Sequence, residues 1–293
     1  MKDLKVVLVV STDPSDLFFG NVLARRLQAA GIAVENQACP EPFSKRGGRW
    51  VGRLLRPWDL PKLWLARRIV AEHVRKSGCI DHAGFGEDGY RLAVPDSCRV
   101  LELSGKGALN SPETVQCIRE LEPDLLVLCG CSILKEELIS VPRLGALNLH
   151  GGLAQCYRGV WTTLWAVVNR EPEYVGATVH FVAPGIDDGE IVFQGRPEIV
   201  ADDNPESLYV KVVQLGVEMM ATAVEAVRTG QVQRHRLEQK GKLYRSSAVT
   251  PEVLATAWRE TELGVIPLYL AQKESRDAPV LRLMRGIFVS GGK

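Results

Sequence analysis

Residues 5–36 read KVVLVVSTDPSDLFFGNVLARRLQAAGIAVEN, and this stretch decides the fold. Residues 5–10 are a continuous β-branched run, which is typical of a strand buried on both faces of a parallel sheet. After a polar turn, apolar residues recur at helical spacing over residues 17–30, and Gly31 ends that helix. Residues 32–36 predict a second strand. The order strand, helix, strand is a βαβ unit and predicts an α/β fold.

The same patterns continue along the chain. They predict strands at 99–103, 124–129, 146–149, 175–182 and 191–200, and helices at 58–76, 112–121, 132–139, 159–169 and 205–229. Two long β-rich runs around a Gly/Asp loop indicate an antiparallel pair at the sheet edge, and residues 82–90 read as a glycine-rich loop. We therefore expect a Rossmann-like, mixed but mostly parallel sheet that is flanked by helices.

Composition limits the classes of partner. The 293 residues include 36 Lys and Arg against 35 Asp and Glu, so a net charge of +1 gives no general reason to expect nucleic acid or an anionic membrane. The apolar runs are far shorter than a membrane-spanning helix requires, and no secretory signal precedes them. Seven scattered cysteines, without metal-ligand spacing, are typical of a reducing compartment. We expect a cytoplasmic protein without a metal.

A strand-end motif is the first candidate for chemistry. Alternation along a strand places Asn148 and His150 on one face, and Gly151 and Gly152 then allow another molecule to approach closely. An imidazole beside a carboxamide suits proton transfer next to a developing oxyanion. The alternative is that a strand-end Asn and His serve structure, which is the commoner role of such residues.

Two further segments could join this motif. The loop at residues 185–189 carries Asp187 and Asp188, and a carboxylate there could orient the imidazole if the loop folds back onto His150. Acidic residues flanked by glycine are also ordinary turn residues. Residues 129–134 follow a parallel strand, which is the usual ligand position in open α/β sheets.

These stretches carry a family resemblance. Residues 123–130 (PDLLVLCG), 141–152 (VPRLGALNLHGG) and 184–191 (PGIDDGEI) resemble the formyltetrahydrofolate-dependent formyltransferases. That family includes methionyl-tRNA formyltransferase, glycinamide ribonucleotide transformylase and the sugar N-formyltransferases. The resemblance implies a catalytic domain over residues 1–230, with an atypical insertion at 40–98 and a small C-terminal appendage at 231–293.

The resemblance also implies roles. An unprotonated primary amine would attack the formyl carbon of N10-formyltetrahydrofolate, Asn148 and protonated His150 would stabilise the oxyanion, and Asp187 would hold the imidazole. The residues implied in binding the donor are Cys131, Ile133, Leu134, Gly151, Gly152 and Asp188. The residues expected to contact the amine acceptor are Ser11, Thr12, Asp13, Tyr157 and Arg158.

The sequence departs from the family pattern at three positions near the site. Gly152 stands where the family often has Ser, and Gln155 and Lys135 stand where it has Pro. The departures leave the three catalytic residues intact and concern the contacts to the folate.

The basic stretch at residues 45–76 bears on the acceptor. It holds ten basic and two acidic residues, interleaved with Trp50, Trp58 and Trp64. Such a stretch could bind a phosphorylated substrate or a stacked base. The alternative is a solvated helical face whose tryptophans reach the core. Among the other histidines, we expect His180 to be a packing or sheet-face residue. We expect His73, His82 and His235 to be exposed.

The resemblance also bears on the acceptor, because methionyl-tRNA formyltransferases carry a C-terminal barrel of roughly domain size. The last sixty or so residues here are near the lower size limit for such a unit and are not strongly basic, so the comparison disfavours a tRNA substrate. The leading hypothesis is therefore an N-formyltransferase acting on a small amino sugar that is phosphorylated or nucleotide-linked. The alternatives are an amino-acid-like acceptor, a formyltetrahydrofolate hydrolase and a non-catalytic folate-binding relative. A homodimer stays open.

Overall fold

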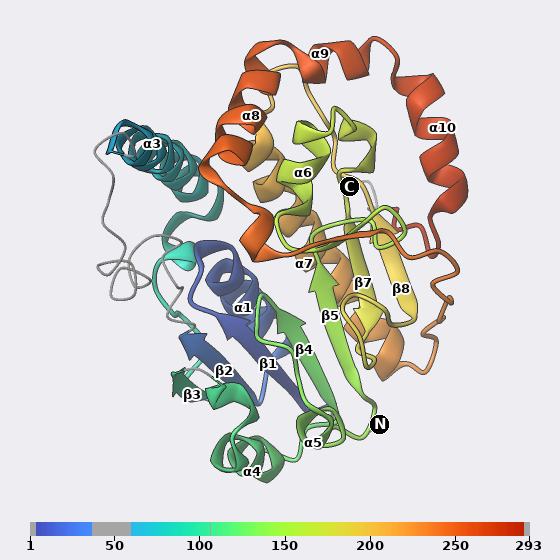
Figure 1. Cartoon of the computed structure of the whole chain (residues 1–293). Coiled ribbons are helices and arrows are strands. Elements are labelled where there is room, and N and C mark those ends of the chain that lie inside the picture. The colour runs from blue at the N-terminus through green and yellow to red at the C-terminus, as the bar shows by residue number, and fades with distance from the viewer. Residues whose placement is uncertain (1–3, 37–59, 106, 290–293) are drawn as a thin grey trace.

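A computed structural model describes residues 4–36, 60–105 and 107–289. Its centre is a seven-stranded sheet with the order β3-β2-β1-β4-β5-β7-β8 (Figure 1). The strands are β1 (Val6–Ser11), β2 (Gly31–Asn36), β3 (Arg99–Ser104), β4 (Leu125–Cys129), β5 (Ala146–His150), β7 (Ala177–Phe181) and β8 (Ile191–Gly195). The pairings from β3 to β5 are parallel, and β7 and β8 complete the edge as an antiparallel pair, which confirms the predicted class.

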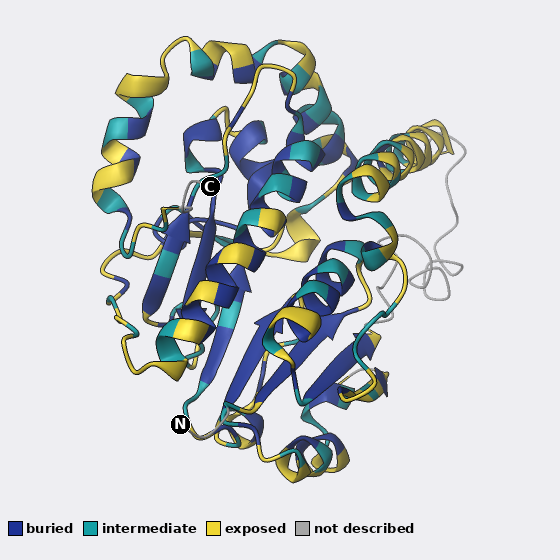
Figure 2. Ribbon diagram, turned by 180° about the vertical axis from the view of Figure 1, so that it is seen from behind, coloured by how far each residue is buried: buried dark blue, intermediate teal, exposed yellow. Residues whose placement is uncertain are grey.

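Helices cover both faces of the sheet (Figure 2). One face packs against α1 (Pro14–Leu27), α6 (Thr162–Val168) and α7 (Pro205–Arg228), and the other against α4 (Pro112–Glu120) and α5 (Glu136–Ile139). Strand β1 shows why: Val6, Leu8 and Val10 join the first core, while Val7 and Val9 join the second. The continuous apolar run thus serves two cores, because side chains alternate across a strand.

Helix α3 (Leu60–Phe85) corrects part of the prediction for residues 82–90, because it continues through their first four positions. It is followed by the 3₁₀ turn η2 (Gly86–Gly89). The Phe85 ring packs 5.1 Å from that of Phe18 on α1, and this buried contact stabilises the last helical turn. The prediction of a core tryptophan is wrong for Trp64, which is 63% exposed. Trp50 and Trp58 lie outside the described residues.

The prediction that His73 is exposed is also wrong. Its side chain is 5% exposed, and its Nδ1 accepts a hydrogen bond of 3.2 Å from the indole N–H of Trp258. This contact comes from a residue 185 positions away, so local sequence does not reveal it. His82 is exposed as predicted, whereas His235 is half-buried and bridges to Ile191 of β8.

The C-terminal part packs onto the same body. Strand β9 (Lys242–Tyr244) pairs in parallel with β6 (Tyr157–Gly159), and three helices then arch over α6 towards β8 (Figure 1). These helices are α8 (Pro251–Glu262), α9 (Val265–Leu270) and α10 (Lys273–Leu283), and the remaining short 3₁₀ turns are η3 (Ala108–Asn110), η4 (Pro172–Tyr174) and η5 (Ser246–Ala248). Tyr269 of α9 is fully buried in the core that lies under α1 and α7.

No helix among the described residues is both long and apolar enough to cross a bilayer.

The docking of α3 gives a prediction for stability. We expect Phe85→Ala to lower the free energy of unfolding by about 3 to 5 kcal/mol, because it removes a buried aromatic ring. Leu65→Ala on the exposed face of the same helix is the matched control, and we expect a change within about 0.5 kcal/mol. Equal effects of the two changes in urea unfolding would contradict this packing.

Candidate functional site

The structure brings Asn148, His150 and Asp187 together. Asn148 and His150 occupy alternate positions at the carboxyl end of β5, and Asp187 lies in the loop that connects β7 to β8. The Oδ2 atom of Asp187 is 3.4 Å from Nδ1 of His150 and accepts a hydrogen bond of 2.7 Å from the backbone N–H of Gly159. The loop therefore does fold back onto the histidine.

His150 is held from two sides. Its Nε2 lies 2.8 Å from the carbonyl oxygen of Tyr157, and because a carbonyl only accepts, Nε2 carries the proton. Nδ1 then faces the Asp187 carboxylate at 3.4 Å. The imidazole is 4% exposed. A Cβ on Gly152 would lie 2.8 Å from Nε2, so the departure from the family's Ser lets the loop approach the ring.

His180 belongs to the same cluster, which sequence reasoning missed. Its Nε2 accepts a hydrogen bond of 3.2 Å from the amide of Asn148 and lies 3.7 Å from Oδ1 of Asp187, while its Nδ1 donates to the carbonyl of Phe181. The expectation of a packing residue is corrected by the register of β5 and β7, which places His180 opposite Asn148. Antiparallel pairing of the two strands was the signal that could have found it.

The charge of Asp187 is strongly favoured. Burial opposes its ionisation, but His150, His180 and the N–H of Gly159 outweigh burial and hold the pKa of this carboxyl well below its usual range. Asp187 is therefore a permanent anion between two histidines.

A second buried carboxyl lies where β1 and β4 end. Asp16 accepts a hydrogen bond of 2.6 Å from Ser11, and Cys129 approaches its other oxygen at 3.4 Å. A Cβ on Gly130 would lie 1.7 Å from Oδ2 of Asp16, and Gly130 has φ +63°, so both space and backbone require glycine there. Burial raises the pKa of Asp16 to about 6.

The predicted acceptor residues separate into two places. Ser11 is buried against Asp16, whereas Thr12 and Asp13 are exposed at the carboxyl edge of the sheet. Tyr157 is buried, with its hydroxyl donating to Glu171.

Arg158 lies on the same side as Tyr157. It donates hydrogen bonds to the carbonyls of Ile186 and Gly241. The bond to Ile186 stabilises the acidic loop, residues 185–189. Asp188 is paired with Lys240 at 2.6 Å. Among the residues that were predicted to contact the acceptor, Tyr157 contacts His150 through its backbone carbonyl, whereas Thr12 and Asp13 lie apart from His150.

The predicted donor segment is fixed by a residue that the sequence did not reveal. Asn110 donates a hydrogen bond of 3.0 Å to the carbonyl of Ile133 and accepts one of 2.7 Å from the backbone N–H of Lys135. A proline at position 135 could not supply this N–H. Ile133 is 68% exposed, Cys131 is half-buried and Leu134 is buried in the core beside α5.

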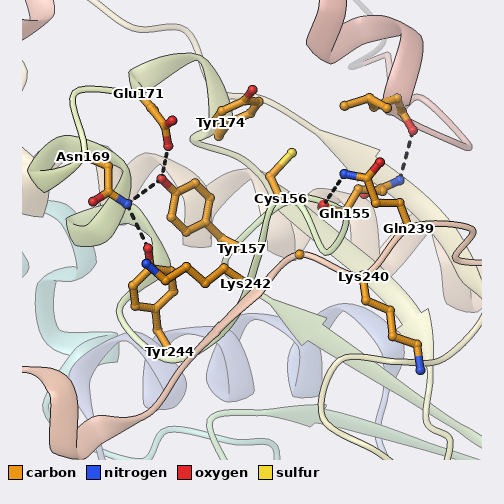
Figure 3. A pocket seen from close by; sticks show the side chains of 12 residues that line it. Gln155, Cys156, Tyr157, Asn169, Glu171, Tyr174, Gln239, Lys240, Lys242 and Tyr244 are labelled. Carbon is orange, nitrogen blue, oxygen red and sulfur yellow. Dashed lines mark hydrogen bonds between the residues drawn. The ribbon is translucent and has the colours of Figure 1, made fainter.

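A cavity of about 580 Å³ lies against the loop that follows β5 (Figure 3). The amide of Asn169 donates to the hydroxyls of both Tyr157 and Tyr244, whose rings stack with centroids 5.5 Å apart. The lining residues are Gln155, Cys156, Tyr157, Asn169, Glu171, Tyr174, Gln239, Lys240, Gly241, Lys242, Tyr244 and Leu283. His150 contacts this wall through the carbonyl of Tyr157.

Asp16 gives a pH-dependent prediction. Because its folded pKa lies near 6 and its unfolded value near 3.8, the folded state binds the extra proton between these values. The wild-type chain should therefore lose stability relative to Asp16→Asn as pH rises from about 4 to about 6, by about 2 to 3 kcal/mol. Chemical unfolding of both proteins across this range measures the difference. A difference that does not vary with pH would contradict the assignment.

Part of the chain is similar to known proteins. The family model described as "Formyl transferase" matches residues 91–224. A methionyl-tRNA formyltransferase of Methylacidiphilum infernorum is 36% identical over 127 residues, which are 43% of this chain and 39% of that protein. The aligned stretches cover about half, or less, of the first curated relatives.

Solved structures share the fold. A sugar N-formyltransferase from a Shewanella species has a TM-score of 0.51 at 20% identity, over 83% of this chain and 78% of that one. A phosphoribosylglycinamide formyltransferase from Anaplasma phagocytophilum has a TM-score of 0.52 at 16% identity, over 84% of this chain and all of that one. The matched residues 91–224 contain Asn148, His150 and Asp187, so the similarity to formyl transferases covers the candidate site.

Proposed function

We propose that this protein transfers the formyl group of N10-formyltetrahydrofolate to a primary amine of a small acceptor. The observation that carries the proposal is the convergence of a carboxamide, a buried imidazole and an ionised carboxylate at the carboxyl end of β5. That edge is where open α/β sheets place their ligands. The similarity of residues 91–224 to formyl transferases supports the same reaction class.

The proposed reaction is nucleophilic substitution at the formyl carbon. The unprotonated amine attacks, a new C–N bond forms and the formyl oxygen becomes an oxyanion. Asn148 donates one hydrogen bond to His180 among the described residues, so its second amide hydrogen serves the oxyanion. Collapse of the intermediate breaks the bond to N10 of the folate. The amine loses one proton and N10 gains one.

His150 and Asp187 supply electrostatics to this step. The Asp187 anion stabilises the imidazolium of His150, whose Nε2–H is anchored on the carbonyl of Tyr157. A positive charge is thereby fixed beside the carbon that becomes tetrahedral, and it cannot rotate away. Fixed charges in a site that excludes water stabilise a developing oxyanion more strongly than they would in solvent.

We further propose that the donor's pterin ring covers residues 131–134. Ile133 exposes most of its side chain at the ligand edge of the sheet, and the flat face of the aromatic pterin would remove that surface from water. Asn110 holds the backbone of this segment in place. We also propose Gly151, Gly152 and Asp188 as donor-binding residues.

For the acceptor we propose a small amino sugar that is phosphorylated or nucleotide-linked. Helix α3 supports this class because its exposed surface is basic, with Lys62, Arg67, Arg68 and Arg75 among its residues. Arginine and lysine suit phosphate recognition. The kinship with sugar N-formyltransferases in fold agrees with this choice.

Formyl transfer can be tested directly. The full chain is incubated with N10-formyltetrahydrofolate and a panel of nucleotide-linked amino sugars, free amino sugars and amino acids. Tetrahydrofolate release is followed by absorbance and the formylated amine by mass spectrometry. We expect acceptor-dependent release, and we expect His150→Asn and Asp187→Asn each to lower kcat by about 10² to 10⁴. His82→Asn, at an exposed histidine, is the matched control and should leave kcat unchanged.

The outcomes separate the alternatives. Formate release without any amine would indicate a hydrolase, and donor binding without turnover by the folded protein would indicate a non-catalytic relative. An unchanged rate in His150→Asn would contradict the mechanism.

A further inference from the structure

A pair of buried glutamines joins the loop after β5 to the C-terminal end of the chain. Gln155 is 4% exposed and Gln194, on β8, is fully buried. Their side-chain amides bond reciprocally, with Nε2 of Gln155 donating over 2.8 Å and Nε2 of Gln194 donating over 2.6 Å. Two such bonds between planar amides fix both separation and orientation.

Every hydrogen of the two amides has an acceptor. The second hydrogen of Gln155 goes to the carbonyl of Leu283 at 3.1 Å, and that of Gln194 goes to Oγ1 of Thr178 at 3.0 Å. The side-chain oxygen of Gln194 also accepts the backbone N–H of Arg285 at 2.8 Å. A buried network of this kind is stable when it is complete and costly when one member is lost.

One arm of the network leads to His150. Thr178 lies opposite His150 in the pairing of β5 with β7. Its hydroxyl donates to the carbonyl of Gly152 over 2.7 Å and accepts the N–H of Ala154 over 3.3 Å. The same loop ends at Tyr157, whose carbonyl anchors Nε2 of His150. The loop is therefore tied at Gly152, Ala154 and Gln155 before it reaches the catalytic ring.

The other arm leads to residues 283–288. The backbone N–H of Gln194 donates to the carbonyl of Gly286 at 3.0 Å, and the N–H of Phe288 donates to the carbonyl of Gln194 at 2.8 Å. Gly286 has φ +54°, and a Cβ there would lie 2.2 Å from the carbonyl oxygen of Val192. Residues 283–288 therefore lie against β8 in a position that leaves no room for a side chain at Gly286.

Packing fixes part of this loop, since Leu153 and Ala154 lie in buried apolar clusters. The cavity of about 580 Å³ lies against Gln155, Cys156 and Tyr157, so this side of the loop faces open space (Figure 3). The Nε2 atom of Gln155 donates to the carbonyl of Leu283. On the side that faces the cavity, Gln155 therefore supplies the bond between this loop and the C-terminal segment.

We propose that Gln155 and Gln194 are positioning residues that make residues 283–288 a working part of the active site. They hold the 152–157 loop so that the carbonyl of Tyr157 meets Nε2 of His150. The proposal rests on the proposed function for its kinetic consequence, but not for its structural one. The proposal gives a role to part of the C-terminal region, residues 231–293, whose function no sequence motif indicates.

The test uses methionine, which matches glutamine in length and lacks the amide. Gln155→Met and Gln194→Met each leave buried partners unpaired and should lower Tm. The double variant removes both amides together, so only partners outside the pair, such as the Leu283 carbonyl and the Arg285 N–H, stay unpaired, and it should regain part of that loss. We nevertheless expect kcat for formyl transfer to stay at least 10-fold low in the double variant, with KM for donor and acceptor changed less than 3-fold.

A second readout does not need an acceptor. Long-range ¹H–¹⁵N spectra of histidine-labelled protein at pH 8 report which nitrogen of His150 is protonated, with His150→Asn for assignment. We expect the Nε2-protonated form in the wild type and a mixture of tautomers in the double methionine variant. If kcat recovers together with Tm and the His150 signals match the wild type, the pair is only structural and the proposal is wrong.

Two glycines give a matched pair at the C-terminal segment. Gly286→Ala should push residues 283–288 off Val192 and reproduce the kinetic and spectral changes. Gly264→Ala carries the same kind of backbone cost, since φ is +81°, but meets no atom within 4 Å and should change neither. Failure of formyl transfer in all proteins, with the His150 spectra as expected, would reject the proposed function alone. Identical effects of the two alanines would reject the positioning role.

Discussion

The site depends on the two opposed partners of one imidazole. The carbonyl of Tyr157 accepts a hydrogen bond from Nε2–H of His150, and the carboxylate of Asp187 faces Nδ1. Because the ring is almost fully buried, neither nitrogen can form its hydrogen bond with solvent water instead. The positions of the acidic loop, the 152–157 loop and strand β5 are therefore constrained together, and the rest of the fold supplies these constraints.

The sheet provides the first of them. Parallel pairing of β4 with β5 brings their carboxyl ends to one edge, and the antiparallel return through β7 places His180 opposite Asn148. Because β7 is antiparallel to β5, its connection to β8 begins at the opposite end of β5, and it folds back to bring Asp187 beside His150 and His180. A mixed sheet thus assembles an amide, two imidazoles and a carboxylate from two neighbouring strands and one connection, without any contribution from a remote domain.

Much of this arrangement could be predicted from the sequence, because the local spacing of apolar residues indicates strands, helices and their buried faces. The run at residues 5–10 predicted a strand with two buried faces, and alternation placed Asn148 and His150 together. His180 was missed because strand pairing depends on register, which a single sequence does not show. His73 was misjudged because its partner, Trp258, is distant in the chain. The reciprocal hydrogen bonds between Gln155 and Gln194 could not be predicted either, because the two residues are distant in the chain. The sequence showed only that position 155 departs from the family's proline.

The most direct measurement is the protonation of His150 in the wild-type chain and in Asp187→Asn at pH 8, observed by ¹⁵N spectroscopy. The account predicts a proton on Nε2 in the wild type, because the Tyr157 carbonyl can only accept it. In Asp187→Asn the amide can donate to Nδ1, so the Nε2 proton should persist while the Nδ1 signal moves as its neighbour changes. A wild-type ring protonated on Nδ1 with a bare Nε2, or an Nδ1 signal unaffected by the substitution, would contradict the account.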